Sequence, residues 1–136
     1  MPMSAALSQD FLKYNFTTNS VLTRPTAWYL SLHTADPGRT GANELTTGVD
    51  SAYARKAASW ATSDTEADGI YELKNSADIN MNAAGVGASY SVTHVGVWTA
   101  SSGGTFLGSI ALAVALPTVA GTINSFATGD LIFQGV

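Results

Sequence analysis

The segment Pro25–Gly38 carries the pattern that most restricts how this chain can fold. Its central residues alternate in the way that an extended strand distributes side chains between two faces. One face receives Trp28, Leu30 and Leu32, and the other receives Tyr29, Ser31 and His33. Proline is tolerated at the first position of a strand, and Asp36-Pro37-Gly38 is a turn sequence that ends it. Because a strand with one strongly apolar face needs a covering layer, the segment predicts a layered β-protein.

The low content of charged residues is a second constraint. Charged residues make up 12% of the 136-residue chain, about half of the roughly 25% that is typical of soluble domains. The cores of protein interfaces are depleted of charge in the same way. We therefore expect neighbouring molecules to cover much of the surface. The alternative is a monomer whose surface is polar but uncharged.

The composition also argues against several kinds of partner. The net charge is −4 and no basic patch is present, so nucleic acid is not expected. The chain has no cysteine, which excludes disulfides and thiolate metal sites. Met1–Ser4 lacks the features of a signal peptide, and the longest apolar run, Ile110–Leu116, is far shorter than the ~20 residues of a membrane span. We therefore expect no association with membranes.

One helix is predicted, at the N-terminus. Between Ser4 and Phe16 a single apolar stripe recurs at i, i+4 and i+7, formed by Leu7, Phe11 and Tyr14. Ser4 is a suitable N-cap, and the polar run 17–20 ends the helix. A helix of this length is marginal in water, so we expect it to dock on the sheet or on a neighbour. Residues 1–20 are thus expected to form a helical arm and residues 21–136 a single β-domain.

The rest of the chain is typical of short strands separated by glycine-rich turns. The run 105–116 alternates with period two, with Phe106 and Ile110 on one face, until Pro117 interrupts it. The run 89–99 is apolar on both faces near its end, which indicates a central strand. Further extended segments are expected at 52–60, 70–73 and 77–81, with a closing hairpin of 122–126 and 131–136 around the turn 127–130. We expect an all-β fold, a β-sandwich or jelly roll, with one short N-terminal α-helix.

No set of residues predicts a catalytic, cofactor or metal site, so the chain is not expected to be an enzyme. It contains no Gly-x-Ser-x-Gly nucleophile elbow. His33, His94 and Asp36 would form a metal site only if the fold happened to bring them together. The loop carboxylates, considered for glycoside cleavage, have no aromatic sugar platform beside them: Asp36, Glu44, Asp50, Asp64, Glu66 and Asp68. Residues 64–69 match the first half of a calcium loop, but its twelfth position is Asn75 instead of glutamate.

Two structural expectations concern the long loop 36–50 and the tryptophans. A loop of this length is usually functional or flexible. Glu44 and Arg55 bracket it, and a bridge between them would close it, although an exposed bridge contributes little stability. The three tryptophans lie in alternating segments and are expected to anchor the core instead of forming ligand platforms: Trp28, Trp60 and Trp98.

Several segments resemble a known family. The run Arg24–Gly38, followed by Thr40–Glu44 and Tyr53–Arg55, is similar to sequences of small structural proteins of tailed bacteriophages. Later segments agree with it, namely Val92–Trp98, Gly103–Leu107 and Ala127–Asp130. The resemblance covers nearly the whole chain. It implies a non-enzymatic part of the virion, assembled in the cytoplasm of the bacterial host.

We expect, within this class, a capsid decoration or cement protein that binds across capsid subunits and stabilises the assembled head by linkage. The alternative is a tail fibre or tail-tip subunit involved in host attachment, and a polysaccharide-cleaving enzyme is a third hypothesis. The expected partners are copies of the chain itself, as a dimer or trimer, and the major capsid protein or other virion proteins. The residues expected at partner contacts are Leu7, Phe11 and Tyr14 in the helix and Asp36, Arg39 and Glu44 in the loop.

Overall fold

The computed structural model describes residues 3–63 and 72–134. Within these ranges the chain forms one helix, α1 (Ala5–Phe16), and strands in sheets of four, three and two. The four-stranded sheet has the order β2 (Lys56–Ala58), β1 (Trp28–His33), β6 (Ser89–Trp98), β7 (Phe106–Val119). The three-stranded sheet has the order β3 (Trp60–Ser63), β4 (Glu72–Asn75), β9 (Ile132–Gln134), and β5 (Ile79–Asn80) pairs with β8 (Ser125–Phe126).

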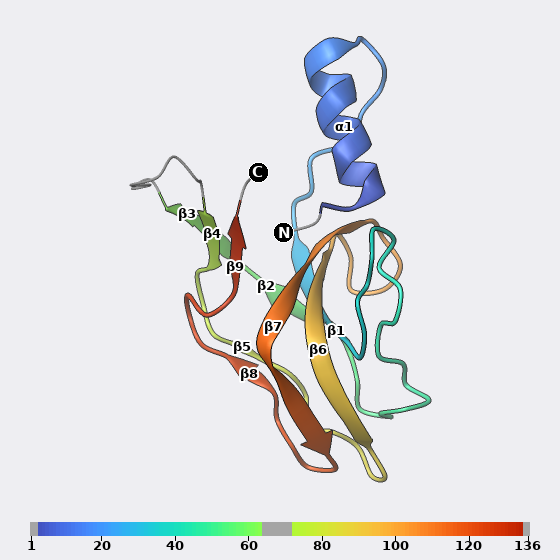
Figure 1. Ribbon diagram of the computed structural model, residues 1–136, viewed down its shortest axis with the longest axis vertical. Coiled ribbons are helices and arrows are strands. Elements are labelled where there is room, and N and C mark those ends of the chain that lie inside the picture. The colour runs from blue at the N-terminus through green and yellow to red at the C-terminus, as the bar shows by residue number, and fades with distance from the viewer. Residues whose placement is uncertain (1–2, 64–71, 135–136) are drawn as a thin grey trace.

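The four-stranded sheet lies between the two smaller sheets on one side and the loop that follows β1 on the other (Figure 1). On the side of the smaller sheets, Leu30 is opposite Val97 and Leu32 is opposite Val95 across the antiparallel β1–β6 pair. These four side chains join the main core, to which the smaller sheets contribute Ile79, Phe126 and Phe133. Ser31 and His33 are buried on the other face of β1, under the loop. The predicted division of β1 into two faces, and the central place of β6, are confirmed.

The prediction of an all-β class with one short helix is confirmed. The finer prediction of a β-sandwich or jelly roll is not confirmed, since the strands opposite the four-stranded sheet belong to two separate small sheets. In the parts of the chain that the structure describes, no helix has the length and apolar character needed to cross a membrane.

Helix α1 has the predicted bounds and caps. The Ser4 hydroxyl oxygen accepts a hydrogen bond from the backbone N–H of Leu7 at 3.0 Å, and Thr17 closes the C-terminal end through the Lys13 carbonyl. The helix extends beyond the end of the four-stranded sheet (Figure 1). None of its side chains is buried. Its own chain therefore supplies little of the packing that normally stabilises a short helix.

Strand β7 departs from the sequence prediction in the position of its end and in its register. It continues through Pro117, which lies opposite Ser91, to Val119. An edge strand tolerates proline because alternate N–H groups face away from its neighbour, and β7 is at the edge. The register also shifts near Leu107, so that Phe106 packs beside the Trp98 ring while Ile110 packs against the core. The prediction that Phe106 and Ile110 share a face is wrong, because this bulge reverses the alternation.

The predicted closing hairpin is also wrong, although its turn forms. β8 pairs with β5 and β9 pairs with β4, so the two segments belong to different sheets. The buried Asn75 holds the turn: its side-chain N–H donates to the Ala127 carbonyl at 2.9 Å, and its side-chain oxygen accepts from the Leu131 N–H at 3.0 Å. Asn75 is the last residue of β4, so this strand ends two residues after the predicted segment 70–73. Residues 70 and 71 of that segment lie outside the described ranges.

Candidate functional site

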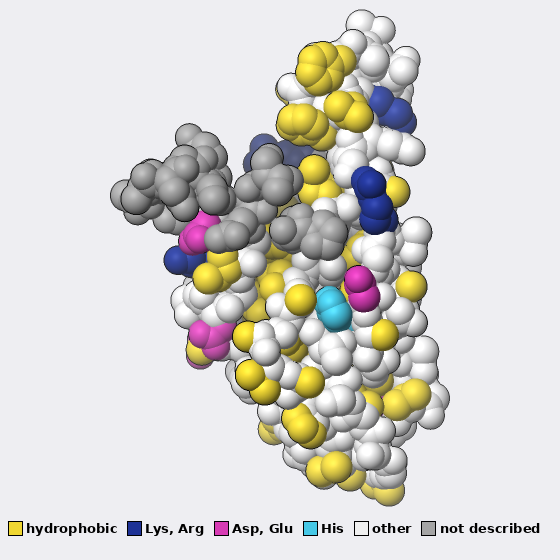
Figure 2. Space-filling model, viewed as in Figure 1, with side chains coloured by type: hydrophobic (Ala, Val, Ile, Leu, Met, Phe, Trp, Pro, Cys, Tyr) yellow, Lys and Arg dark blue, Asp and Glu magenta, His cyan; other side chains and the backbone are white. Residues whose placement is uncertain are grey.

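The exposed large apolar side chains of the described chain are concentrated on α1 and on the segment that returns from it. Figure 2 shows yellow side chains over α1 on the face of the molecule that it presents. We use the name N-terminal apolar surface for the exposed apolar residues of α1 and the returning segment, which are Phe11, Leu12, Tyr14, Phe16, Val21 and Leu22. Monomeric soluble proteins rarely leave apolar side chains contiguous on their surface unless a partner covers them. This surface is therefore the candidate functional site.

A groove runs between α1 and the returning segment. Its volume is about 450 Å³, and the predicted contact residues Leu7, Phe11 and Tyr14 line it together with Trp28 and Leu107. The Asp10 carboxylate accepts a hydrogen bond from the Leu22 N–H at 2.9 Å, which holds the returning segment beside the helix. The fold thus brings the three predicted helix residues together along one groove.

A second apolar cavity, of about 300 Å³, adjoins this groove, with Leu7, Trp28 and Leu107 lining both. Its deeper wall includes Trp60 and Phe133, whose rings meet edge to face with centres 5.0 Å apart. Trp28 and Trp60 pack against the core, as predicted. Trp98 instead lies on the loop-covered face, beside Phe106.

The structure also shows a second apolar face on α1 that the sequence analysis missed. Leu12 and Phe16 do not line the groove, and they remain 57% and 77% exposed. Their separation by four residues places them on one side of the helix. That spacing is visible in the sequence, but it is hidden by the stronger stripe of Leu7, Phe11 and Tyr14.

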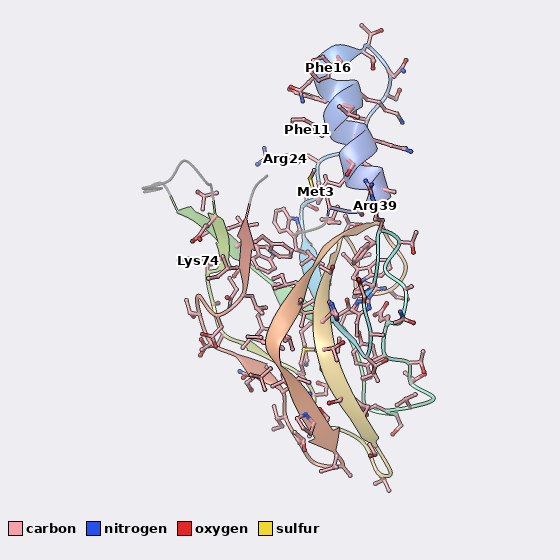
Figure 3. All side chains as sticks on the ribbon, viewed as in Figure 1. Met3, Phe11, Phe16, Arg24, Arg39 and Lys74 are labelled. Atoms are coloured by element: carbon pink, nitrogen blue, oxygen red, sulfur yellow. The ribbon has the colours of Figure 1, made fainter. Side chains whose placement is uncertain are left out.

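The three predicted contact residues of the loop have separate roles within the chain. Arg39 lies at the base of α1 (Figure 3), and its guanidinium donates to the Ser8 hydroxyl at 2.9 Å. The Asp36 carboxylate accepts from the Gly38 N–H at 2.8 Å within the turn. Glu44 is paired with Arg55. Only Arg39 is bonded to the helix, and a contact of these residues with a partner stays a prediction.

The predicted bridge between Glu44 and Arg55 is confirmed and is largely buried. Arg55 Nε and Nη2 donate to the two oxygens of Glu44 at 2.8 and 2.7 Å, and the Arg55 side chain is only 8% exposed. The Tyr53 hydroxyl donates to the same carboxylate at 2.9 Å. Burial alone would raise the pKa of Glu44, but the hydrogen bonds from Arg55 and Tyr53 outweigh it and lower this pKa below its ordinary value.

The buried ring of His33 fastens the loop to the sheet. Its Nε2 lies 2.7 Å from the Ser31 hydroxyl and its Nδ1 lies 2.8 Å from the Ala42 carbonyl oxygen. Desolvation by burial lowers the pKa of His33 below 6.5 and outweighs the opposing effects of Ala42 and Glu44. Both ring nitrogens are thus engaged within the chain.

Asp50, another loop residue considered for chemistry, is also engaged in the fold. Asp50 accepts hydrogen bonds from the N–H groups of Gly85 and Ala52 and from the Tyr90 hydroxyl. Within residues 3–63 and 72–134, no three His, Asp or Glu side chains gather as a metal site would require. The residues considered for calcium, Asp64, Glu66 and Asp68, lie outside the described ranges.

Comparison with known families identifies the class of protein. The family model described as "Podophage GP4 fiber I protein gp80" matches residues 2–134. No curated protein matches the sequence. The match confirms the resemblance to structural proteins of tailed phages and their location in the virion.

Proposed function

The chain belongs to the podophage fibre protein family, and from that premise we propose that it is a structural subunit of a phage tail fibre. The observation that carries the proposal is the match of a fibre family over residues 2–134, nearly the full length of the chain. The alternative in the sequence analysis is therefore better supported than its main hypothesis, a capsid decoration protein. The decoration hypothesis depends on the low content of charged residues and on the expected oligomerisation. A fibre subunit would have both of these properties.

The role of the subunit would be mechanical and not catalytic. Two of the six loop carboxylates considered for glycoside cleavage, Glu44 and Asp50, are committed to hydrogen bonds within the fold. The N-terminal apolar surface offers instead an area to be covered on assembly (Figure 2). Burial of such area is the main favourable contribution in most protein association. We propose that this surface joins the subunit to its neighbours in the fibre.

The position of the protein in the virion tests this function. Gold-labelled Fab fragments raised against the purified chain should mark the tail fibres of intact virions in electron micrographs. Quantitative mass spectrometry of the same virions should give far fewer copies of this chain than of the major capsid protein. Label spread over the head, with a copy number close to that of the capsid protein, would reject the fibre assignment and restore the decoration hypothesis.

A further inference from the structure

We propose that a polar pocket between the loop that follows β1 and the β6–β7 hairpin binds a neutral saccharide. The pocket shares no residue with the N-terminal apolar surface, and the proposal does not depend on the assignment to a fibre. It is carried by the groups that line the pocket, by a donor of a buried arginine that the fold leaves unused, and by the balance of charge beneath the pocket.

The pocket is formed where two connecting segments of the four-stranded sheet meet. The loop after β1 supplies one wall and the β6–β7 hairpin the other, and the two lie side by side (Figure 1). The volume is about 420 Å³, which is within the range of small-molecule sites. Its rim carries four exposed hydroxyl side chains, those of Thr46, Thr47, Ser101 and Ser102. None of them has a hydrogen-bond partner in the part of the chain that the structure describes, so all are available to a ligand.

The pocket floor is the ion pair of Arg55 and Glu44, whose side chains are 8% and 21% exposed. A guanidinium carries five N–H donors. Nε and Nη2 of Arg55 donate to Glu44, and Nη1 donates to the carbonyl oxygens of Ala100 and Gly103. Four of the five donors are thus used. Within residues 3–63 and 72–134, the second N–H of Nη2 has no acceptor.

An acceptor position lies next to this unused donor. The Glu44 oxygen Oε2 accepts one hydrogen bond in the described chain, from Arg55 Nη2 at 2.7 Å. A carboxylate oxygen has lone pairs for two such bonds. The pocket floor therefore offers one donor and one acceptor side by side. Hydroxyl groups suit both positions, because each can donate and accept.

The charge of the pocket floor favours a neutral ligand. Burial alone would raise the pKa of Glu44, but the hydrogen bonds from Arg55 and Tyr53 lower it, so the pair remains ionised at neutral pH. An anion would meet the Glu44 carboxylate and a cation would meet the Arg55 guanidinium. Either ligand would place like charges together.

The lining also argues against an apolar ligand and against cleavage. Apolar ligands occupy pockets lined mainly by hydrophobic and aromatic side chains, whereas polar side chains predominate here. A neutral molecule rich in hydroxyl groups fits this lining, and saccharides are such molecules. Glu44 is the only carboxylate among the described residues that line the pocket. Because glycoside cleavage requires two carboxyl groups, we propose binding without hydrolysis.

Binding to this pocket should be weak for a single sugar unit. Each hydrogen bond to the ligand replaces one to water, so its net contribution is small. We therefore expect a dissociation constant in the millimolar range. Several copies held in one assembly would bind a polysaccharide more tightly, because the linked pockets raise the effective concentration of its sugar units.

NMR spectroscopy of the isotopically labelled full chain tests the proposal. The probes are the methyl glycosides of glucose, galactose and N-acetylglucosamine at millimolar concentrations. At least one should shift the Arg55 Nε–H resonance in a saturable manner. The double variant Thr47→Val, Ser102→Ala should weaken this binding at least about threefold, because it removes two rim hydroxyls.

The matched control is the double variant Thr18→Val, Ser20→Ala. It removes two exposed hydroxyls from the segment after α1, which does not line the pocket, and should bind like the wild type. Thermal unfolding checks that both variants are folded. We expect unfolding temperatures close to that of the wild type, because the changed side chains are exposed.

The proposal is wrong if none of the glycosides gives a saturable shift, or if the rim variant binds as tightly as the wild type. Methyl glucuronide provides an anionic probe, and tighter binding of it than of methyl glucoside would overturn the preference for a neutral ligand. N-acetyl-triglycine amide tests a polypeptide main chain. If this peptide alone shifts the Arg55 resonance, the pocket binds peptide and not saccharide. None of these results would alter the location of the protein in the virion, which is measured separately.

Discussion

The guanidinium of Arg55 lies 3.8 Å from the centre of the Trp98 ring while it forms a two-pronged ion pair with Glu44. Its remaining nitrogen, Nη1, donates to the carbonyl oxygens of Ala100 and Gly103. One side chain therefore connects the loop after β1, the β6–β7 hairpin and the face of the sheet. Such a planar, multiply bonded arrangement requires the geometry of arginine and not only its charge.

Arg55→Lys should consequently destabilise the protein even though the charge is kept. We expect a loss of about 2–3 kcal/mol in the free energy of unfolding, because lysine cannot form the paired hydrogen bonds or stack on Trp98 in the same way. Urea denaturation of both proteins measures the difference. The control is Lys74→Ala, which removes an exposed bridge of 3.3 Å to Glu72 and should cost less than about 1 kcal/mol. Equal losses in the two variants would contradict this view of Arg55.

The stability of the protein should decrease as the pH falls below about 6.5. The pKa of His33 is lowered in the folded state by burial, so the unfolded chain binds a proton more readily than the folded chain does. Stability from the neutral His33 is complete above the unfolded pKa and is lost as the pH falls toward the lower folded pKa. Glu44, His94 and Arg55 also act on His33 electrostatically. The free energy of unfolding, measured by chemical denaturation between about pH 7 and pH 5, tests this prediction. Most carboxylates do not titrate in this range, so they contribute little to the change.

The comparison variant for this pH effect is His33→Gln. It should be less stable at neutral pH, because the contacts with Ser31 and Ala42 are disturbed, but its stability should change less over the same pH range. The readout is the slope of the unfolding free energy with pH. An unchanged slope in the variant would show that His33 is not the responsible group.

Gly96 marks a place where the loop-covered face of the sheet has no spare volume. A Cβ atom at this position would lie 2.6 Å from both His33 Nε2 and the Ser31 hydroxyl oxygen. Gly96→Ala should therefore destabilise the protein by about 1–3 kcal/mol through overpacking. At Gly48 the nearest atom to an added Cβ is 3.6 Å away, so Gly48→Ala should be nearly neutral. Melting temperatures of the two alanine variants give the comparison, and a Gly96 variant as stable as the Gly48 variant would count against this packing.

Asp50 and Tyr90 should show graded effects. Asp50→Ala leaves the N–H groups of Gly85 and Ala52 and the Tyr90 hydroxyl without their acceptor, and we expect a loss of about 2–4 kcal/mol. Tyr90→Phe removes a single donor and should cost about 1 kcal/mol. Chemical denaturation measures both. A tyrosine variant less stable than the aspartate variant would reverse the expected order and place the main support elsewhere.

Burial alone would raise the pKa of Asp50, but the hydrogen bonds from Gly85, Tyr90 and Ala52 outweigh it and hold the pKa below 3.8. The folded chain therefore keeps this carboxylate charged to lower pH than the unfolded chain does. Stability from Asp50 is present above the unfolded pKa and is lost as the pH falls through the folded pKa. This acid region lies below the range in which His33 acts.

The features that the sequence determined are those fixed by local backbone geometry. Alternation in β1 separated Leu30 and Leu32 from Ser31 and His33 because successive side chains of a strand point to opposite faces. Ser4 capped the helix through a hydrogen bond only three residues away. These relationships span few residues, so they can be predicted without knowing what lies nearby in space.

Only the tertiary structure decided which segments meet. Nothing local indicates that Asn75 holds the turn before Leu131, and this long-range bond helps place β8 and β9 in different sheets. The apolar spacing within α1 likewise cannot show which side its own chain covers, and only the structure shows that Leu12 and Phe16 lie outside the groove. Side-chain periodicity gives the faces of an element, whereas the partner of each face depends on contacts between residues far apart in the chain.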